Sequence, residues 1–295
     1  MEKPLSAKKP PPIVAPPIRP LVTREFVFTA ADFERIRKLI HAYAGISLAD
    51  TKQDMVYSRL ARRLRETQKR TFSEYLELLE RGDKGECERF VNALTTNLTS
   101  FFREPHHFPI LAAHLKKLPG KATIRIWCSA ASTGEEAYSI AMTAVETFNS
   151  FNIPVTILAS DLDTNVLSVA ARGVYAADRV DKLSPERLSR FFTRSPGAAG
   201  DSYTVKPELR RLLSFQRINL LEANWPVRGP LDILFCRNVM IYFDKPTQYR
   251  ILSRFAPLLD AEGLLFAGHS ESFIHAADLF RPLGRTVYRL SSGKH

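Results

Sequence analysis

A stretch near the middle of the chain constrains the fold most. Ile124–Cys128 is a short apolar run, typical of a buried strand, and the small residues after it allow a ligand to approach the backbone. Glu135 and Glu136 then stand in the first turn of a predicted helix, where the helix dipole favours negative charge. Strand, small-residue turn and helix form the first unit of a nucleotide-binding α/β domain. Since Gly134 is the only glycine of the turn, the pattern fits a ligand loop and an ordinary connection equally well.

Composition narrows the class of protein. The 295 residues carry a net charge of +11, which predicts an acidic partner such as nucleic acid, a membrane surface or an acidic protein. The three cysteines, Cys87, Cys128 and Cys236, lie in apolar or helical contexts, so we expect reduced thiols and neither a disulfide framework nor a metal site. No apolar run is long enough to span a bilayer and the N-terminus lacks a signal-peptide core, so a cytoplasmic protein is expected.

The region before the central stretch divides into three predicted parts. Residues 1–24 are rich in proline and basic, and we expect a disordered tail. Residues 25–96 are predicted to form a helical domain, whose first helix begins after an N-cap at Thr29 and ends at Gly45. Residues 97–119, a polar linker followed by a helix, lead into the central stretch and are expected to contribute to the site.

Residues 120–295 alternate strands with helices, which predicts a doubly wound α/β domain. The second strand leads into Asp161 and Asp163. An acid at this place can accept hydrogen bonds from the ribose hydroxyls of an adenosine, or it can cap the next helix, and two acids allow both. Residues 175–214 break the alternation with short helices and a hairpin, which indicates an inserted β-subdomain.

Polar residues follow several of the predicted strands, at the edge where open α/β sheets bind ligands. Neither G-x-G-x-x-G nor G-x-x-x-x-G-K-[ST] occurs, which argues against a dinucleotide site and against a P-loop triphosphate site. A nucleoside without phosphates remains, and S-adenosylmethionine fits this description. Its ribose suits Asp161, and its positively charged sulfonium and amino groups suit a carboxylate such as Glu135.

Six segments are unusual in composition: Asn97–Phe108, Ala130–Tyr138, Ala159–Asp163, Asn219–Glu222, Phe235–Asp244 and Leu264–Glu271. In these segments the chain resembles the CheR-type chemotaxis receptor methyltransferases, and the resemblance extends across about residues 26–290. It implies a small all-α N-terminal domain followed by a Rossmann-like class I methyltransferase domain with a small inserted β-subdomain. It also implies a protein-glutamate O-methyltransferase. Such an enzyme uses S-adenosylmethionine to convert glutamates of chemoreceptors (methyl-accepting chemotaxis proteins) into methyl esters for chemotactic adaptation, leaving S-adenosylhomocysteine.

The resemblance also assigns site residues. By the family pattern the cofactor is held by Asn97, Thr99, Arg103, Glu135, Asp161, Asn219, Leu220, Arg237 and Asn238, with Glu136 as an alternative to Glu135. Arg103 and Tyr242 look like the catalytic pair near the methyl group. A glutamate side chain, with an ordinary pKa of about 4.3, is already an anion and needs no general base. No metal is expected, because neighbouring histidines such as His106 and His107 point in different directions on a helix.

Partners follow from the same resemblance. Arg59, Arg62, Arg63 and Arg65 lie on a predicted helix, about residues 50–69, with few acidic residues, and we expect them to dock the acidic receptor helices. The insertion resembles a subdomain that tethers a receptor C-terminal peptide in some members, although its loop differs in composition. A monomer that does not bind nucleic acid is expected. Two alternatives stay open: a nucleic-acid methyltransferase, although the N/D-P-P-Y/F motif is missing, and a cofactor-binding module without catalysis.

Overall fold

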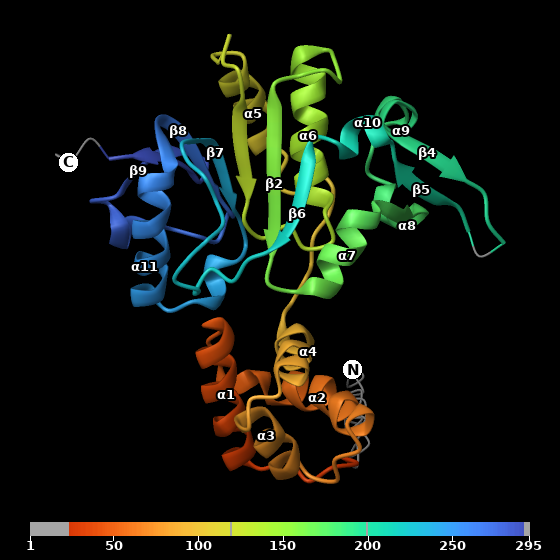
Figure 1. Ribbon diagram of the computed structural model, residues 1–295, viewed down its shortest axis with the longest axis vertical. Helices are drawn as coiled ribbons and strands as arrows, with labels where there is room; N and C mark the ends of the chain where they lie inside the picture. Colours follow the sequence, from red (N-terminus) through yellow and green to blue (C-terminus); the bar gives the residue numbers. More distant parts are fainter. Residues whose placement is uncertain (1–23, 119, 199, 292–295) are drawn as a thin grey trace, which may run out of the picture.

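The computed structural model describes residues 24–118, 120–198 and 200–291, so the predicted tail lies outside the described residues except for Arg24. Figure 1 shows a helical part at one end of the molecule and an α/β part at the other. The chain passes from the first to the second through the segment between α4 and α5. The cofactor-site residues expected from the sequence lie in this segment and in the α/β part.

The helical part consists of α1 (Ala30–Ala44), a 3-10 turn η1 (Asp50–Lys52), α2 (Gln53–Glu66), α3 (Phe72–Glu80) and α4 (Lys84–Leu94). The predicted ends of the first helix are confirmed. Thr29 caps α1 in a capping box, and Gly45 ends it with a left-handed φ of 67°. The apolar faces of the helices meet around Ile36, Leu60 and Leu76, which are fully buried. This part therefore has a core of its own.

The main sheet has seven strands in the order β6-β2-β1-β7-β8-β10-β9. Their bounds are β1 (Ile124–Cys128), β2 (Val155–Asp161), β6 (Leu213–Arg217), β7 (Leu231–Cys236), β8 (Leu259–Ala267), β9 (Phe280–Gly284) and β10 (Val287–Leu290). The strands from β6 to β8 are parallel, and β10 is antiparallel to both of its neighbours. The first strand in the sequence, β1, lies inside the sheet, with β2 and β6 on one side of it and β7 to β10 on the other. This arrangement confirms the predicted doubly wound fold class.

The strand β9 is not predicted from the sequence. Pro282 and Gly284 interrupt its apolar pattern, and both residue types weaken a central strand. They are tolerated here because β9 lies at the edge of the sheet, where it pairs with β10 alone.

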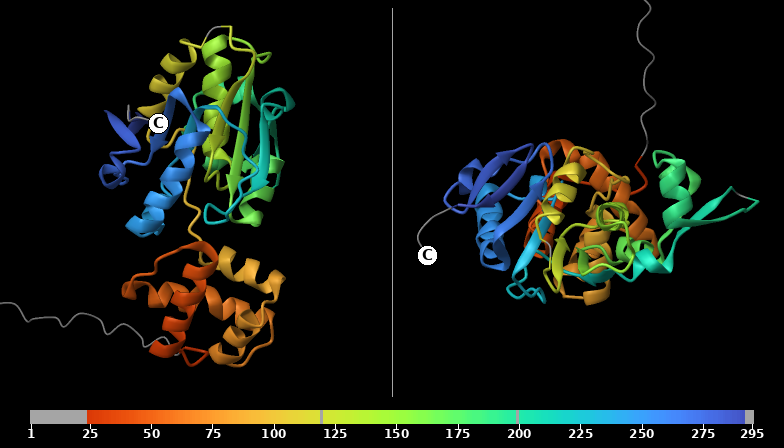
Figure 2. Two further views of the ribbon diagram at one scale, coloured as in Figure 1. Left: turned by 60° about the vertical axis from the view of Figure 1, so that its left-hand side comes forward. Right: turned by 90° about the horizontal axis from the view of Figure 1, so that it is seen from above.

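Helices cover both faces of the main sheet, as Figure 2 shows from two further directions. They are α5 (His107–Leu115), α6 (Glu135–Phe148), α7 (Thr164–Arg172) and α11 (Lys245–Phe255), with 3-10 turns η2 (Met240–Tyr242), η3 (Ala256–Leu258) and η4 (Ile274–Ala276). Alternate side chains of β1 point to opposite faces of the sheet. Ile126 belongs to the core that α5 and α6 complete, whereas the Trp127 ring lies 5.3 Å from the ring of Phe255 on α11.

The predicted insertion is a separate three-stranded antiparallel sheet in the order β3-β5-β4. It comprises β3 (Val174–Ala176), α8 (Ala177–Val180), α9 (Pro185–Phe191), β4 (Phe192–Ser195), β5 (Ser202–Val205) and α10 (Pro207–Arg210). The predicted hairpin is confirmed as β4 and β5, and β3 adds a third strand. The Tyr175 hydroxyl of β3 donates to the Thr133 carbonyl at 2.8 Å, which ties the insertion to the turn after β1.

Candidate cofactor and methyl-transfer site

A pocket lies where the helical part meets the carboxyl edge of the main sheet. Its walls come from the loops that follow β1, β2, β6 and β7, from the segment before α5, and from the ends of α1 and α4. Most of the predicted site residues line it: Asn97, Thr99, Arg103, Asp161, Asn219, Leu220, Arg237, Asn238 and Tyr242. Segments far apart in sequence thus converge at the edge where open α/β sheets bind ligands.

Asp161 provides the carboxylate expected for a ribose. Its two oxygens accept the backbone N–H of Ser132 at 2.8 Å and of Asp163 at 3.0 Å. Burial raises the pKa of Asp161 to about 6, although these backbone donors act in the opposite direction. The neighbouring Asp163 caps α7 by accepting from Asn165 and Val166. Of the two roles that the sequence left open, Asp163 thus fills the helix cap, and Asp161 lines the pocket.

The two glutamates at the start of α6 point to different places. Glu135 is fully buried, accepts the Thr133 hydroxyl and pairs with Arg179 of the insertion, so its carboxylate lies outside the pocket. Glu136 lines the pocket. Consecutive helix residues point about 100° apart, which directs the two carboxylates to different surroundings. The alternative, Glu136, is therefore the one with access to a cofactor.

A buried ion cluster holds the floor of the pocket together. The Arg237 side chain is fully buried between two carboxylates, with Glu136 Oε2 at 2.7 Å and Glu104 Oε2 at 3.1 Å. It also donates to the Arg103 carbonyl at 2.6 Å. Burial works to raise the pKa of Glu104, but hydrogen bonds from His269 and the charge of Arg237 lower it to about 2. Glu104 is thus an anion at neutral pH and the partner of Arg237.

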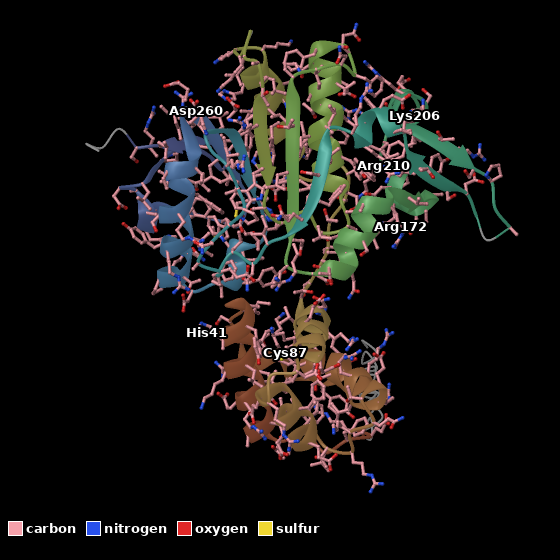
Figure 3. The ribbon with its side chains drawn as sticks, in the orientation of Figure 1. His41, Cys87, Arg172, Lys206, Arg210 and Asp260 are labelled. Carbon is pink, nitrogen blue, oxygen red and sulfur yellow. The ribbon has the colours of Figure 1, made fainter. Side chains whose placement is uncertain are left out.

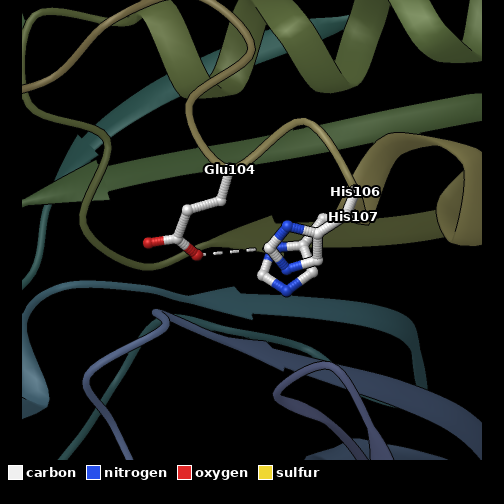
Figure 4. Close-up of side chains that lie close together, drawn as sticks. All are labelled: Glu104, His106 and His107. Carbon is white, nitrogen blue, oxygen red and sulfur yellow. Dashed lines mark ion pairs between the residues drawn. The ribbon is translucent and has the colours of Figure 1, made fainter.

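Glu104 also stands beside two histidines, as Figure 4 shows. Ligand-type atoms of Glu104, His106 and His107 lie within 4.8 Å of one another. The Glu104 carboxylate already forms an ion pair with Arg237, and the His107 Nε2 lies 3.1 Å from the Thr286 hydroxyl. A cation here would have to displace a guanidinium, so we propose no metal for this group.

Arg103 and Tyr242, the expected catalytic pair, both line the pocket and are partly exposed, which places them at its mouth. Arg103 Nη1 donates to the Leu98 carbonyl at 2.9 Å. The Tyr242 hydroxyl lies 3.5 Å from the Thr96 carbonyl, a contact at the limit of a hydrogen bond. The Tyr242 hydroxyl is therefore held weakly, and the Arg103 guanidinium makes one ordinary hydrogen bond to a backbone carbonyl, so both can turn toward a substrate carboxylate.

The helical part supplies a wall that the sequence did not predict. Ala44, Ile46 and Leu94 line the pocket with apolar surface. Two hydrogen bonds hold this wall in place, from Ser47 N to the Tyr242 carbonyl and from Asn219 Nδ2 to the Tyr43 carbonyl, both at 2.9 Å.

A longer contact supports the same junction. His41, at the end of α1 that faces the α/β part (Figure 3), lies 3.8 Å from Asp244. An apolar wall opposite a buried carboxylate suits the base and the ribose of a nucleoside.

The α2 arginines are not as free as the sequence suggested. Arg63 is only 12% exposed and makes a two-pronged pair with Glu86 of α4, and Arg59 donates to the carbonyls of Ala93 and Thr95. The more exposed pair, Arg62 and Arg65, contact Glu66 and Glu25. Glu66 belongs to α2 itself, whereas Glu86 and Glu25 come from other parts of the chain, and no local pattern reveals those two pairings.

A doubly wound sheet with a pocket at its carboxyl edge, in a chain without a dinucleotide or P-loop glycine motif, suits a methyltransferase that uses S-adenosylmethionine. Residues 97–289 match the model of the CheR methyltransferase SAM-binding domain, and residues 31–95 match that of the CheR methyltransferase all-alpha domain. The chain belongs to the CheR methyltransferase family. The predicted resemblance and the predicted cofactor are thereby confirmed.

Curated relatives agree over most of the chain. A chemotaxis protein methyltransferase 2 of Pseudomonas aeruginosa is 53% identical over 90% of this chain and 95% of its own length. The chemotaxis protein methyltransferases of Escherichia coli and Salmonella typhimurium are each 49% identical over 92% of this chain and 94% of their own lengths. Within the described ranges, no helix combines the length and apolar character needed to cross a membrane.

The pKa of Asp161 leads to a testable pH dependence. Ribose hydroxyls donate hydrogen bonds, so they bind the ionised carboxylate better, and a proton must leave when the cofactor binds below the pKa of about 6. The affinity for S-adenosylhomocysteine should therefore fall about tenfold between pH 7.5 and pH 5, measured by calorimetry.

The matched control is Asp161→Asn, which has no proton to lose at this position. It should bind more weakly at pH 7.5 and with little change between the two pH values. An equal pH dependence in wild type and Asp161→Asn would assign the effect to another group, such as Glu136.

Proposed function

We propose that this protein transfers a methyl group from S-adenosylmethionine to glutamate side chains on the cytoplasmic helices of chemoreceptors, yielding glutamate methyl esters. The observation that carries the proposal is the joint presence of Asp161, Glu136, Arg103 and Tyr242 around one pocket. The chemotaxis methyltransferases among the relatives support a receptor as the substrate. We place the reaction in the cytoplasm, where such receptor segments lie.

The proposed cofactor contacts follow the chemistry of the lining. Asp161 accepts the ribose hydroxyls, and the apolar residues Leu162, Ile218 and Leu220 face the base. Glu136 provides negative charge toward the sulfonium and amino groups. Asn97 and Asn238 add amide groups around the same pocket. When bound, S-adenosylmethionine supplies an electrophilic methyl group.

The residues at the mouth act on the substrate carboxylate. Because a glutamate with a pKa of about 4.3 is already ionised, its attack is limited by hydration and alignment, and proton transfer is not required. The Arg103 guanidinium holds the carboxylate through charge-assisted hydrogen bonds. The Tyr242 hydroxyl orients one of its oxygens. The α1 and α4 wall keeps water away from the inner side.

Receptor docking is proposed for Arg62 and Arg65. Their side chains are 78% and 58% exposed, and their ion pairs with Glu66 and Glu25 are surface pairs that solvent screens, so they contribute little to stability. Such pairs exchange readily for carboxylates of an acidic helix. Arg59 and Arg63 instead join α2 to α4, so they support the docking helix from behind.

The reaction is tested with labelled S-adenosylmethionine and a purified receptor cytoplasmic fragment. We expect label on the fragment that mild base releases as methanol, because methyl esters hydrolyse and N-methyl groups do not. Asp161→Ala should give no label, because the variant lacks the proposed ribose carboxylate. Base-stable label, or label on DNA or RNA offered in place of the fragment, would contradict the proposal.

Docking is tested by the double variant Arg62→Glu/Arg65→Glu. Loss of two attractive contacts should raise the KM for the receptor fragment about tenfold. The affinity for S-adenosylhomocysteine should stay unchanged.

The control for docking carries the same change in charge elsewhere. Lys116 and Lys117 are exposed at the far end of α5, so Lys116→Glu/Lys117→Glu tests charge alone. An equal rise of the KM in both double variants would refute a docking site on α2.

A further inference from the structure

A buried carboxylate with no direct place in the pocket lies behind the loop that carries Asn238 and Tyr242. Glu271 is 5% exposed. Its Oε1 accepts the backbone N–H of Val239 at 2.9 Å and of Met240 at 2.8 Å. Its Oε2 accepts the backbone N–H of Asn238 at 2.9 Å and of Gly268. Four backbone donors on one side chain make this a fixed anion site that the chain fills itself.

The same loop is held from its other side by a neutral side chain. Gln248 of α11 is 7% exposed, and its Nε2 donates to the carbonyls of Met240 at 2.8 Å and Phe243 at 3.0 Å. Glu271 thus binds the N–H groups of the loop, and Gln248 binds its carbonyl groups. The two side chains thus hold the turn over residues 238–243 from two sides.

This loop needs outside support. Its only regular structure is η2, a single 3-10 turn of three residues, and Asn238 has a left-handed φ of 58°, which is uncommon outside glycine. The contact with Gly268 is also close, because a Cβ there would lie 2.3 Å from Asn238 Nδ2. Such a conformation persists only when the surrounding structure imposes it.

The support matters for the reaction because both ends of the loop line the pocket. Asn238 faces the cofactor region. Tyr242 lies at the mouth, and its hydroxyl makes one long contact, 3.5 Å, with the Thr96 carbonyl. The hydroxyl contact is too weak to fix the tyrosine, so its place depends on the loop backbone and on the packing of its ring against the helical core. We propose that Glu271 is a positioning residue for methyl transfer, acting through the turn over residues 238–243 on Tyr242 and Asn238. The proposal rests on the proposed function of the same site.

The test is Glu271→Gln in the full-length enzyme with the receptor fragment. Glutamine keeps the volume but turns an NH₂ group toward two N–H donors, so at least two hydrogen bonds are lost. We expect kcat to fall on the order of tenfold to a hundredfold, since a small displacement of a reacting group has effects of this size. The KM for the receptor fragment should change much less.

The matched control is Asp232→Asn. Asp232 is an equally buried carboxylate, which accepts the backbone N–H of Arg125 at 2.9 Å and pairs with Lys121, at the opposite edge of the sheet. It should lower the melting temperature and leave kcat per folded molecule near wild type. Equal kcat in the two variants would overturn the proposal.

A double-mutant cycle separates positioning from a general loss of structure. In the Tyr242→Ala background, Glu271→Gln should lower kcat by less than about threefold, because the group that it places is gone. Full additivity would contradict the proposal. If Glu271→Gln fails to fold, Gln248→Met releases the same turn from its other side and should show the same loss of kcat and the same non-additivity.

The proposal can fail separately from the proposed function. Absence of base-labile methyl transfer by the wild-type enzyme would refute the function itself. Wild-type transfer together with an unchanged kcat in both Glu271→Gln and Gln248→Met would refute only the positioning role.

Discussion

The buried ion cluster of Glu136, Arg237 and Glu104 is the interaction on which the site depends. It joins three segments that are distant in sequence: the start of α6, the end of β7 and the linker before α5. Removing one partner from such a cluster typically costs about 3–5 kcal/mol, because a buried charge is left without compensation. The Arg237 guanidinium also donates a hydrogen bond to the Arg103 carbonyl. The same side chain therefore stabilises both the cofactor side and the substrate side of the pocket.

Around this cluster, hydrogen bonds between buried side chains and backbone groups shape the pocket. Asp161 is held by two backbone N–H groups, and the loop over residues 238–243 is held by Glu271 and Gln248. The side chains that remain loosely held, Arg103 and Tyr242, are those proposed to meet the substrate. A rigid frame with two adaptable groups at its mouth fits a reaction that requires alignment and exclusion of water.

Sequence patterns predicted the fold class and most of the pocket because strand ends and helix caps are local features. Ile124–Cys128 and Asp161 were recognised from apolar runs and their following polar residues. The choice between Glu135 and Glu136 was beyond the sequence, since it depends on which side of α6 faces Arg237. The sequence also could not predict the pairing of Arg63 with Glu86 or the pocket wall at Ile46, because these contacts form between separate elements.

The most direct measurement is the affinity of Arg237→Lys for S-adenosylhomocysteine, followed by calorimetry together with thermal unfolding. Lysine keeps the charge but lacks the planar fork that reaches two carboxylates and the Arg103 carbonyl together. If the cluster organises the pocket, the affinity falls at least about tenfold at temperatures where the variant is still folded. An affinity within about twofold of wild type would contradict the account, since two broken ion-pair contacts predict a larger loss.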